Sequence, residues 1–442
     1  MAVGIIGTGW VGLVSGLCFA KWGNQVICCD IDESKIEPLN RGVAPFYEPD
    51  MQALLSDQLQ HGNIAFTTDV SECIRESDVI VVCVATPSMP DGDVYLDSLY
   101  KVAAQIAEEI NEHKTVVIKS TVPVGTSQAV AEILGQQKKH TFDVVSNPEF
   151  LREGKAILDM QQPDRVVIGA ETTDIADRVA EIYKPISEQI VRSTNKTAEL
   201  VKYASNAYLA MRISYINSIA RLCDAYHIDI CGLSEILGAD HRIGCSYFDA
   251  GIGYGGSCLP KDLAGLTKML KKNSVDASLF EAVKAVNDTQ IAYFIDTVES
   301  VIGNLSGKQL TVWGLTFKES TDDIRESPAI QLVSELMDRG AKVICNDAVF
   351  AGDWERYEDK LDSIVPKNAI FERDIAESTR GSEAILIAVN SPHYGADAPW
   401  DRIGELVKNK AVFDGRNGAL CVGGLMHKCG FKYYGIGRSF EE

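Results

Sequence analysis

The sequence predicts an α/β protein in which two Rossmann-like, doubly wound domains are joined by a long central helix and a helical middle domain. Three observations support this fold class. Short apolar runs alternate with helical stretches in the first half of the chain, the alternation stops near Asn195, and it returns at Gly307. Strands that are separated by helices connect through right-handed crossovers into mostly parallel sheets. The predicted domains are therefore residues 1–195, 196–300 and 301–442.

The individual elements follow from local patterns. Residues 196–226 contain no Pro or Gly and place apolar side chains on most helix faces, which predicts one long buried helix with more helix to about residue 300. Apolar, β-branched runs bounded by turn residues predict the strands. These runs are 3–6, 25–29, 79–84, 115–118 and 142–145 in the first domain, and 309–314, 341–346, 384–389 and 411–413 in the third.

Composition and charge exclude several classes of function. The 442 residues are 46% hydrophobic and 24% charged, as in ordinary folded proteins, and the formal net charge is −20. An acidic surface repels nucleic acid and anionic membranes, so we expect neither as a partner. No apolar run approaches the ~20 residues of a membrane span, and the N-terminus lacks the regions of a signal peptide. The 12 cysteines show no framework spacing, so we expect reduced thiols in a cytoplasmic protein.

A dinucleotide-binding signature lies at the N-terminus. Residues 7–12, Gly-Thr-Gly-Trp-Val-Gly, match G-x-G-x-x-G between a predicted strand and a predicted helix. The glycines allow a tight turn, close approach of a pyrophosphate and close helix packing. Asp30 lies 23 positions after Gly7, near the ~20 expected for the acid that binds the ribose 2′-hydroxyl. We therefore predict NAD rather than NADP, and the alternative is a glycine-rich turn without a ligand.

A glycine-rich loop leads to a candidate nucleophile. Four of the six residues 251–256 are glycine, which predicts a loop that wraps a ligand with its backbone. Pro260 suits the first turn of a following helix, so Cys258 lies just before a helix N-terminus, with Lys261 close by. Both features favour the thiolate, the nucleophilic form. The alternative is a small core cysteine, which the glycines, the helix start and Asp262 argue against.

Polar residues also interrupt the apolar surface of the long helix. Lys202 and Asn206 are four residues apart and share a face, on which Glu199 and Asn217 also fall. Burying such groups is costly without partners. They serve either as an internal salt bridge with helix–helix hydrogen bonds, or as a cation and an amide donor for a developing oxyanion. Residues 119–123 and 147–154 each follow a predicted strand, at the sheet edge where cofactors bind.

Together these segments resemble the UDP-glucose/GDP-mannose dehydrogenase family, from the first strand nearly to the C-terminus. Residues 255–262 resemble its catalytic-cysteine motif, 147–154 its carboxylate motif, and Lys202 with Asn206 its helical pair. Residues 317–318, 321–327 and 414–417 are similar to motifs of its UDP-binding domain, whereas 345–348 depart from its usual Tyr-Asp-Pro turn. The UDP-glucose branch is favoured by 163–169, by 242–244, and by Ser257, where the branch for N-acetylated sugars tends to carry histidine.

The resemblance implies an NAD-dependent, four-electron oxidation of a nucleotide sugar, with UDP-glucose as the favoured substrate and no metal. The implied catalytic residues are Cys258, Lys202, Asn206, Asp262, Thr121, Glu149 and Glu153. Cofactor contacts are implied for Gly7, Gly9, Trp10, Val11, Gly12, Asp30, Lys35, Thr86, Thr121, Glu153, Lys261 and Arg325. Substrate contacts are implied for Glu149, Phe150, Leu151, Arg152, Glu153, Lys202, Asn206, Arg242, Tyr247, Phe248, Asp249, Ala250, Gly251, Gly255, Lys318 and Arg416.

Each catalytic group has an expected role. Cys258 forms a thiohemiacetal and then a thioester, and Lys202 and Asn206 stabilise oxyanions, each donor contributing ~3 kcal/mol. Glu149 is the expected base for hydrolysis, Glu153 tunes the site, and Thr121 with Asp262 positions water or assists proton transfer. Arg242 and Arg416 are expected to reach a site across a subunit boundary.

Other readings remain open at this stage. The substrate can be GDP-mannose or a UDP-linked amino sugar, and a plain two-electron hydroxyacid dehydrogenase would have no need of Cys258. A catalytically inactive nucleotide-sensing protein would keep the glycines of 7–12 without Cys258, Lys202 and Asp262. The central helix is apolar enough to form a dimer surface or to lie in the chain's own core, and the resemblance favours a homodimer.

Overall fold

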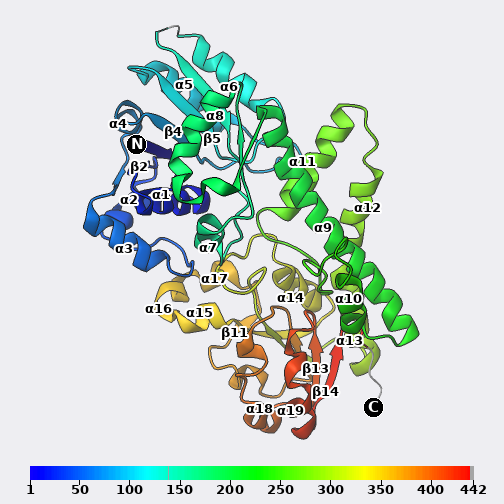
Figure 1. The fold of residues 1–442 in the computed structure, drawn as a ribbon. Coiled ribbons are helices and arrows are strands. Elements are labelled where there is room, and N and C mark those ends of the chain that lie inside the picture. Colours follow the sequence, from blue (N-terminus) through cyan, green and yellow to red (C-terminus); the bar gives the residue numbers. More distant parts are fainter. Residues whose placement is uncertain (138, 439–442) are drawn as a thin grey trace. The chain divides into compact units, whose positions relative to one another are not determined.

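The chain folds into two α/β units, each built around its own sheet (Figure 1). The computed structural model describes residues 1–137 and 139–438. The first unit comprises Met1–Ser205 and Ala264–Asn273, and the second comprises Asn206–Leu263 and the chain from Ser274 onward. Residues 196–300 contribute to both units, because two helices of this region each begin in one unit and end in the other.

The first unit has an eight-stranded sheet of order β3-β2-β1-β4-β5-β6-β7-β8, parallel except where β6 meets β7. The strands are added in one direction from β1 to β3 and in the opposite direction from β4 onward, and doubly wound folds bind dinucleotides at the point between β1 and β4 where this order reverses. The strands are β1 (Ala2–Ile6), β2 (Gln25–Cys29), β3 (Ile64–Thr67), β4 (Val79–Val82), β5 (Lys114–Ile118), β6 (Phe142–Ser146), β7 (Val166–Gly169) and β8 (Ile190–Ser193). The helices are α1 (Trp10–Lys21), α2 (Glu33–Asn40), α3 (Met51–His61), α4 (Val70–Arg75), α5 (Asp97–Glu109), α6 (Thr126–Gly135), α7 (Ala156–Gln161), α8 (Thr173–Ala180) and the 3₁₀ segment η1 (Glu181–Gln189).

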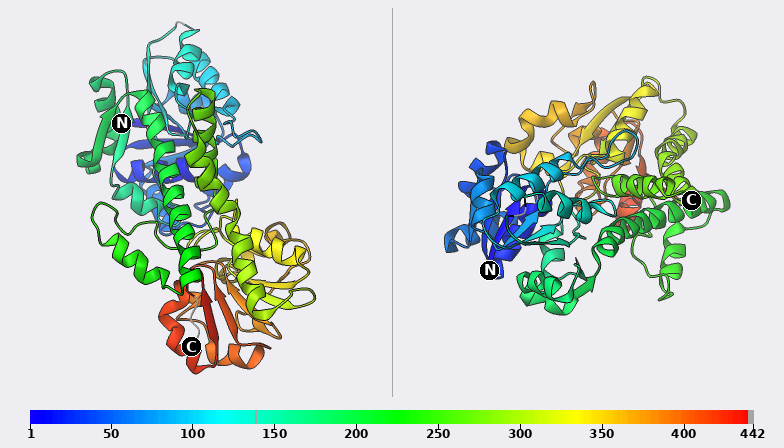
Figure 2. Two further views of the ribbon diagram at one scale, coloured as in Figure 1. Left: turned by 90° about the vertical axis from the view of Figure 1, so that its right-hand side faces the viewer. Right: turned by 90° about the horizontal axis from the view of Figure 1, so that it is seen from above.

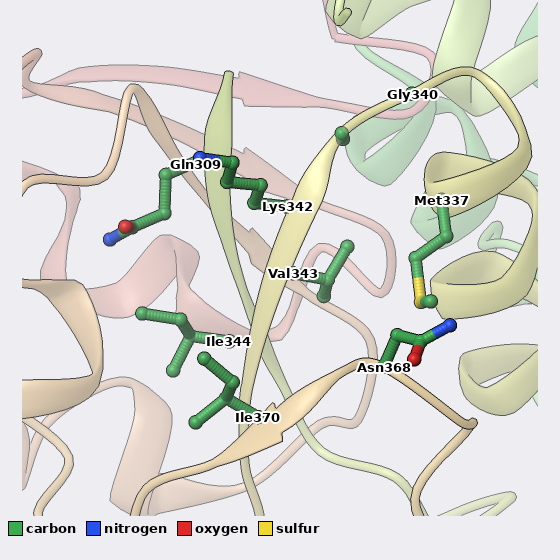
Figure 3. Close-up of a pocket in the computed structure, with 9 residues that line it drawn as sticks. Gln309, Met337, Gly340, Lys342, Val343, Ile344, Asn368 and Ile370 are labelled. Carbon is green, nitrogen blue, oxygen red and sulfur yellow. The ribbon is translucent and has the colours of Figure 1, made fainter. Parts of the chain in front are cut away.

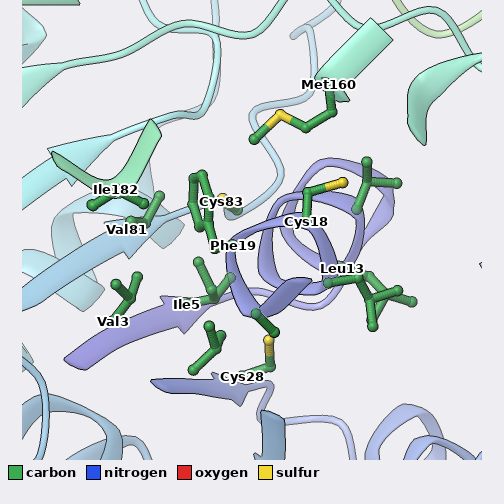
Figure 4. Packing of buried hydrophobic residues seen from close by; sticks show 14 of the residues in the cluster. Val3, Ile5, Leu13, Cys18, Phe19, Cys28, Val81, Cys83, Met160 and Ile182 are labelled. Carbon is green, nitrogen blue, oxygen red and sulfur yellow. The ribbon is translucent and has the colours of Figure 1, made fainter. Parts of the chain in front are cut away.

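The core of this unit lies on both faces of the sheet, as a doubly wound fold requires. On one face, Phe19 of α1 lies beside Ile5 of β1 (Figure 4), and Leu13 and Val3 belong to the same buried cluster. A second cluster on the other face joins residues of β4 and β5 to residues of α4, α5 and α6. Because central strands are covered on both sides, they appear in the sequence as continuous apolar runs.

The second unit has a six-stranded parallel sheet of order β11-β10-β9-β12-β13-β14. Its strands are β9 (Gln309–Trp313), β10 (Lys342–Asn346), β11 (Ile370–Phe371), β12 (Ala384–Ile387), β13 (Ala411–Asp414) and β14 (Lys432–Gly435). Its helices after residue 274 are α12 (Ser278–Asp288), α13 (Gln290–Ile302), α14 (Pro328–Asp338), α15 (Ala348–Gly352), α16 (Trp354–Tyr357), α17 (Leu361–Ile364), α18 (Trp400–Leu406) and α19 (Gly423–Lys428), with 3₁₀ segments η2 (Glu358–Lys360), η3 (Glu377–Thr379), η4 (Pro392–Tyr394) and η5 (Gly418–Val422).

The two sheets share a local arrangement that the sequence does not reveal. Gly7 follows β1 and Gly314 follows β9, with φ of 101° and 90°. Asp30 and Asp347 each follow the neighbouring strand and accept a hydrogen bond from the N–H of the residue after that glycine, at 2.9 and 2.7 Å. The prediction of two Rossmann-like domains is therefore confirmed, both in the parallel sheets and in the turn after the first strand of each sheet.

Five helices lie between the two sheets in sequence: α12 and α13, given above, are preceded by α9 (Asn195–Tyr226), α10 (Ile230–Gly238) and α11 (Leu259–Lys272). The predicted helix 196–226 is confirmed to within one residue. Within the first unit α11 lies beside α9 (Figure 2, left), and a Cβ added at Gly265 would come within 2.7 Å of the Tyr203 ring. Over the described residues, no helix combines the length and the apolar character that a membrane crossing needs.

Candidate functional site

The glycine-rich turn has the predicted strand–turn–helix structure. Helix α1 begins at Trp10, directly after Gly9, and has no acidic residue in its first turn, so its free N–H groups suit an anion. A Cβ on Gly12 would lie 1.8 Å from the Gly7 carbonyl oxygen, whereas one on Gly9 would meet nothing within 4 Å. Gly12 is therefore needed for packing, and Gly9 leaves open space for a ligand. The Trp10 ring stacks on Phe46 at 4.3 Å, while Val11 is half-buried.

Asp30 lies at the carboxyl end of β2, as predicted. Its carboxylate accepts hydrogen bonds from the backbone N–H and hydroxyl of Thr8 at 2.9 and 3.0 Å, and pairs with Lys35 at 3.2 Å. Burial would raise the pKa of Asp30, but the backbone hydrogen bonds and the Lys35 charge lower the pKa overall. Sequence reasoning missed Thr8 and also Ile31, which is 86% exposed next to this carboxylate and offers an apolar surface beside the predicted ribose site. Ile31 could have been identified from its position directly after Asp30, the residue predicted to bind the ribose.

Two predicted threonines meet at the carboxyl end of the sheet. Thr86 follows β4 and Thr121 follows β5, and the Thr86 hydroxyl donates to the Thr121 carbonyl at 2.8 Å. This hydrogen bond joins the loop after β4 to the loop after β5, next to the point between β1 and β4 where the strand order reverses. Both side chains therefore lie at the edge where a dinucleotide binds in this fold.

The carboxylate motif and the long helix meet in a buried ion pair. Oε1 of Glu149 lies 2.8 Å from Nζ of Lys202, with the side chains 7% and 4% exposed. Burial would raise the pKa of Glu149, but the charge and hydrogen bond of Lys202, the Leu151 N–H and the charge of Lys119 together lower the pKa. Lys202 therefore forms an internal salt bridge. Glu149 is predicted to act as the base for hydrolysis, but a carboxylate with a lowered pKa is a weaker base.

The rest of the carboxylate motif is held by neighbours that the sequence did not single out. The Phe150 ring lies 3.9 Å from the Arg165 guanidinium, and exposed Arg152 pairs with Asp159 at 2.6 Å. The buried carboxylate of Glu48 accepts the backbone N–H groups of Gly154 and Ala156 at 2.8 and 2.7 Å. Glu48 therefore fixes the turn that carries half-buried Glu153.

Around the predicted nucleophile, Asp262 organises the polar groups. Cys258 immediately precedes Leu259, the first residue of α11, as predicted, and the Ser257 hydroxyl lies 3.4 Å from its sulfur. The fully buried Asp262 accepts a hydrogen bond from the Asn206 amide at 2.6 Å and pairs with Lys261. One N–H of the Asn206 amide is thus directed to a carboxylate, which leaves a single N–H for the predicted oxyanion role.

The backbone of the glycine loop is engaged by the protein itself. A Cβ on Gly255 would lie 1.9 Å from the Glu326 carbonyl oxygen, so the glycine is needed for close packing. The prediction that this loop wraps a ligand with its backbone is wrong for four N–H groups, which are already bonded at 2.8–3.1 Å. Gly251 and Tyr254 donate to the side chains of Asn217 and Asn287, and Ile252 and Gly256 donate to the carbonyls of Gly415 and Arg325.

Arg416 contacts the backbone of the glycine loop. Its guanidinium donates to the carbonyls of Ala388 and Gly253 at 2.9 and 2.7 Å, and both belong to the same chain and unit. Burial lowers its pKa to about 10, against the opposing charge of Asp414. Within its own chain, Arg416 therefore holds the glycine loop.

The remaining predicted substrate contacts, and the predicted cofactor contact Arg325, lie on two segments of the second unit. Arg242 is 77% exposed and pairs with Asp240 at 2.5 Å. In residues 247–250, Phe248 and Ala250 are buried, Asp249 is exposed and half-buried Tyr247 has a φ of 61°. On the second segment, Lys318 is half-buried and its Nζ lies 5.5 Å from the centre of the Phe317 ring, and Arg325 pairs with Asp323.

A pocket of about 400 Å³ in the second unit lies away from these groups (Figure 3). Gln309 and Lys342, which line it, are the first residues of β9 and β10. It therefore lies at the amino ends of the strands, whereas doubly wound sheets bind ligands at the carboxyl ends. Within residues 1–137 and 139–438, no group of three His, Cys, Asp or Glu residues is placed to hold a metal ion.

Comparison with known proteins gives consistent matches along the chain. Models of the UDP-glucose/GDP-mannose dehydrogenase family match it at residues 1–187 (NAD binding domain), 196–289 (central domain) and 311–419 (UDP binding domain). It is 38% identical to the UDP-glucose 6-dehydrogenase TuaD of Bacillus subtilis, covering 99% of this chain and 93% of that protein. It is also 38% identical to the UDP-glucose 6-dehydrogenase of Rhizobium meliloti, covering 99% and 100%. The solved UDP-glucose dehydrogenase of Pyrobaculum islandicum superposes with a TM-score of 0.88 at 32% identity, covering 99% and 98%.

Proposed function

We propose that this chain, which belongs to the UDP-glucose/GDP-mannose dehydrogenase family, oxidises UDP-glucose to UDP-glucuronate. The family assignment establishes an NAD-binding dehydrogenase fold, and the relatives described above carry the UDP-glucose activity in their names. One observation carries the proposal that the reaction passes through a covalent stage. Cys258 stands directly before α11 on a loop whose backbone is fixed by four hydrogen bonds, as a positioned nucleophile requires.

The residues of the first unit fit NAD. The open space at Gly9 and the uncapped start of α1 suit a pyrophosphate, and the ionised Asp30 suits a ribose hydroxyl. Thr86 and Thr121 lie at the same carboxyl edge of the sheet. When bound, NAD supplies the hydride acceptor for the reaction.

The proposed chemistry removes four electrons in two stages. The primary alcohol at C6 loses a hydride and a proton and becomes an aldehyde. The Cys258 thiolate adds to the aldehyde carbon, and the resulting thiohemiacetal loses a second hydride and a proton to give a thioester. Water then adds to the thioester and releases the carboxylic acid and the thiol, so two NADH form for each UDP-glucose.

The polar groups around this chemistry have proposed roles that suit their contacts. The ion pair with Glu149 favours the charged form of Lys202. The second N–H of the Asn206 amide, which does not donate to Asp262, stabilises an oxyanion. Asp262 holds Asn206 and Lys261 in place and assists proton transfer to water. Glu149 acts mainly by orienting Lys202, because its lowered pKa makes it a poor proton acceptor.

The exposed face of α9 supports a homodimer. In the second unit Tyr208, Tyr215, Leu222 and Tyr226 lie seven, seven and four residues apart, and they are 52%, 49%, 54% and 69% exposed. This is the spacing of a helix seam that packs against another helix. A contiguous apolar stripe of this kind marks an interaction surface, and we propose that a second copy of the chain covers it.

The cysteines support a reducing compartment, and we place the enzyme in the cytoplasm. All 11 cysteines that the structure describes are free thiols, and seven of them are buried. Burial raises the pKa of several of these thiols, including Cys345 to about 12, which makes them inert. Cys258 must also stay reduced to act.

The decisive experiment is to follow NADH absorbance after mixing the protein with NAD and UDP-glucose. We expect two NADH per UDP-glucose consumed. GDP-mannose and UDP-linked N-acetyl amino sugars, tested in parallel, should give kcat/KM values at least tenfold lower. No NADH from any of these sugars would overturn the function, a higher value with another sugar would change the substrate, and a ratio of one would remove the thioester stage.

A further inference from the structure

We propose that Lys119 is a positioning residue for the reaction, which fixes Asn147 and supplies a second buried positive charge beside the Glu149–Lys202 pair. The inference rests on the proposed function, because it concerns the groups that prepare that site for catalysis. All the residues involved belong to the first unit.

Lys119 is a buried cation without an adjacent carboxylate. Its side chain follows β5 and is 3% exposed. Nζ lies 3.2 Å from the hydroxyl of Tyr183 and 3.4 Å from Oδ1 of Asn147, and both partners are uncharged. No carboxylate of the described residues lies within 4.0 Å of this Nζ. A buried charge paired only with neutral groups is costly, so its presence calls for a reason beyond packing.

The first reason is the orientation of Asn147. Its Oδ1 accepts the Tyr183 hydroxyl at 2.5 Å as well as the Lys119 ammonium, and its Nδ2 donates to the Val167 carbonyl at 2.8 Å. The amide is therefore bonded on both sides and has one orientation. Since Glu149 is only two residues further along, this network fixes the turn that carries it.

The second reason is charge. The titratable groups around Glu149 and Lys119 are Lys202 of α9, Cys18 of α1, Cys83 after β4 and Tyr183 of η1. Burial raises the pKa of Cys18 and of Cys83 to about 12 and also raises the pKa of Tyr183, so all three are neutral near pH 7. The charged groups are then one carboxylate and two ammonium groups, with a net charge of +1.

A net positive charge is what the proposed reaction needs at this position. The oxidation develops an alkoxide and later an oxyanion, which fixed positive charge stabilises in a water-poor site. The Glu149–Lys202 pair alone is neutral as a whole. Lys119 therefore both biases Glu149 toward its ionised form and leaves the buried cluster positive.

The test compares Lys119→Met with Lys119→Arg, which keeps the charge. Loss of the charge should raise the pKa of Glu149, so the acid limb of the kcat/KM profile should move to higher pH by roughly half a unit to one unit. Lys119→Arg should keep the limb within about 0.2 units of wild type, and kcat should fall about tenfold only in Lys119→Met. The proposal would be overturned if the acid limb of the kcat/KM profile lay at the same pH in Lys119→Met as in wild type. It would also be overturned if Lys119→Arg shifted that limb as far as Lys119→Met does.

Two further measurements separate this inference from the proposed function and from misfolding. The carboxylate infrared band of Glu149, assigned by its loss in Glu149→Gln, is titrated in each variant without any turnover. It therefore tests Lys119 even if the wild-type protein oxidises no nucleotide sugar.

If Lys119→Met does not fold, Lys119→Gln, which retains a hydrogen-bonding side chain, should show the same shift. Tyr183→Phe should leave the Glu149 titration in place and raise KM for the nucleotide sugar about threefold or more; an unchanged KM would remove the Asn147 part of the proposal.

Discussion

Glu149 and Lys202 form an ion pair that is almost fully excluded from solvent, with 2.8 Å between Oε1 and Nζ. Glu149 comes from the turn after β6, and Lys202 comes from the second turn of α9. Two segments that lie 53 positions apart in the chain are therefore joined by a single charged contact. This contact explains how a lysine is accommodated on a buried helix face.

Removal of one member of the pair should destabilise the first unit. Glu149→Gln leaves a buried ammonium without its carboxylate, and such losses cost about 3–5 kcal/mol. The double variant Glu149→Gln/Lys202→Met should recover more than half of that loss, because it removes both charges. Urea unfolding of the two single variants and the double variant measures the coupling, and simple additivity would show that the pair contributes nothing.

The same pair should make stability depend on pH in the acid range. The folded-state pKa of Glu149 is lowered below its ordinary value. Its contribution is therefore complete above the unfolded-state pKa and is lost as pH falls through the folded-state pKa. Wild type should lose free energy of unfolding below about pH 4.5 more steeply than Glu149→Gln. Parallel slopes for the two proteins between pH 5 and pH 3 would contradict this assignment.

Replacement of the predicted nucleophile should separate the two oxidation stages. In Cys258→Ala no thioester can form, so UDP-glucuronate should fall by about 10³-fold or more while NAD binding stays near wild type. Cys429→Ala is the matched control, because Cys429 is a half-buried thiol beside Asp401 that has no proposed role. Product chromatography and NAD titration are the measurements. Full acid production by Cys258→Ala would remove the covalent mechanism.

The glycine loop gives a prediction that depends on packing alone. In Gly255→Ala the new Cβ would meet the Glu326 backbone oxygen at 1.9 Å, so the loop must shift. We expect a loss of about 1–3 kcal/mol in stability and a larger relative fall in kcat than in NAD affinity. Gly424→Ala in α19 is the control, since its Cβ would meet nothing within 4 Å and helix propensity favours alanine. Equal behaviour of the two variants would show that the loop tolerates displacement.

Much of this architecture could be predicted from local sequence. The buried strands β1, β2, β4, β5 and β6 are apolar runs, and the α9 helix lacks Pro and Gly, so each has a clear signature. Strand β3 alternates exposed and buried residues over only four positions, and β11 has two residues, which leaves too little pattern to detect. Short edge strands are stabilised by their neighbours more than by their own sequence.

The sequence proposes the residues of a candidate site but not the contacts between them. Spacing placed Lys202 and Asn206 on one helix face, yet their partners Glu149 and Asp262 are distant in sequence and emerge only from the tertiary fold. The glycines before Cys258 suggested ligand binding, because sequence cannot distinguish a glycine needed for a ligand from one needed for a neighbouring backbone. Side chains such as Asn217 and Asn287, which bind that loop, have no motif of their own.

The exposed seam of α9 gives the last prediction. Leu222 is 54% exposed within the stripe that contains Tyr215 and Tyr226, and a charge there would be buried on dimerisation without a partner. Leu222→Glu should raise the dimer dissociation constant at least 100-fold, while the fold of each unit, measured by circular dichroism, stays intact. Leu425→Glu is the control, because Leu425 is similarly exposed at 42% but lies on α19, away from this seam. Sedimentation equilibrium across micromolar concentrations should find wild type and Leu425→Glu as dimers and Leu222→Glu as monomers. A wild-type monomer at every concentration would rule out the dimer, and a dimer that survives Leu222→Glu would place the interface on a different surface.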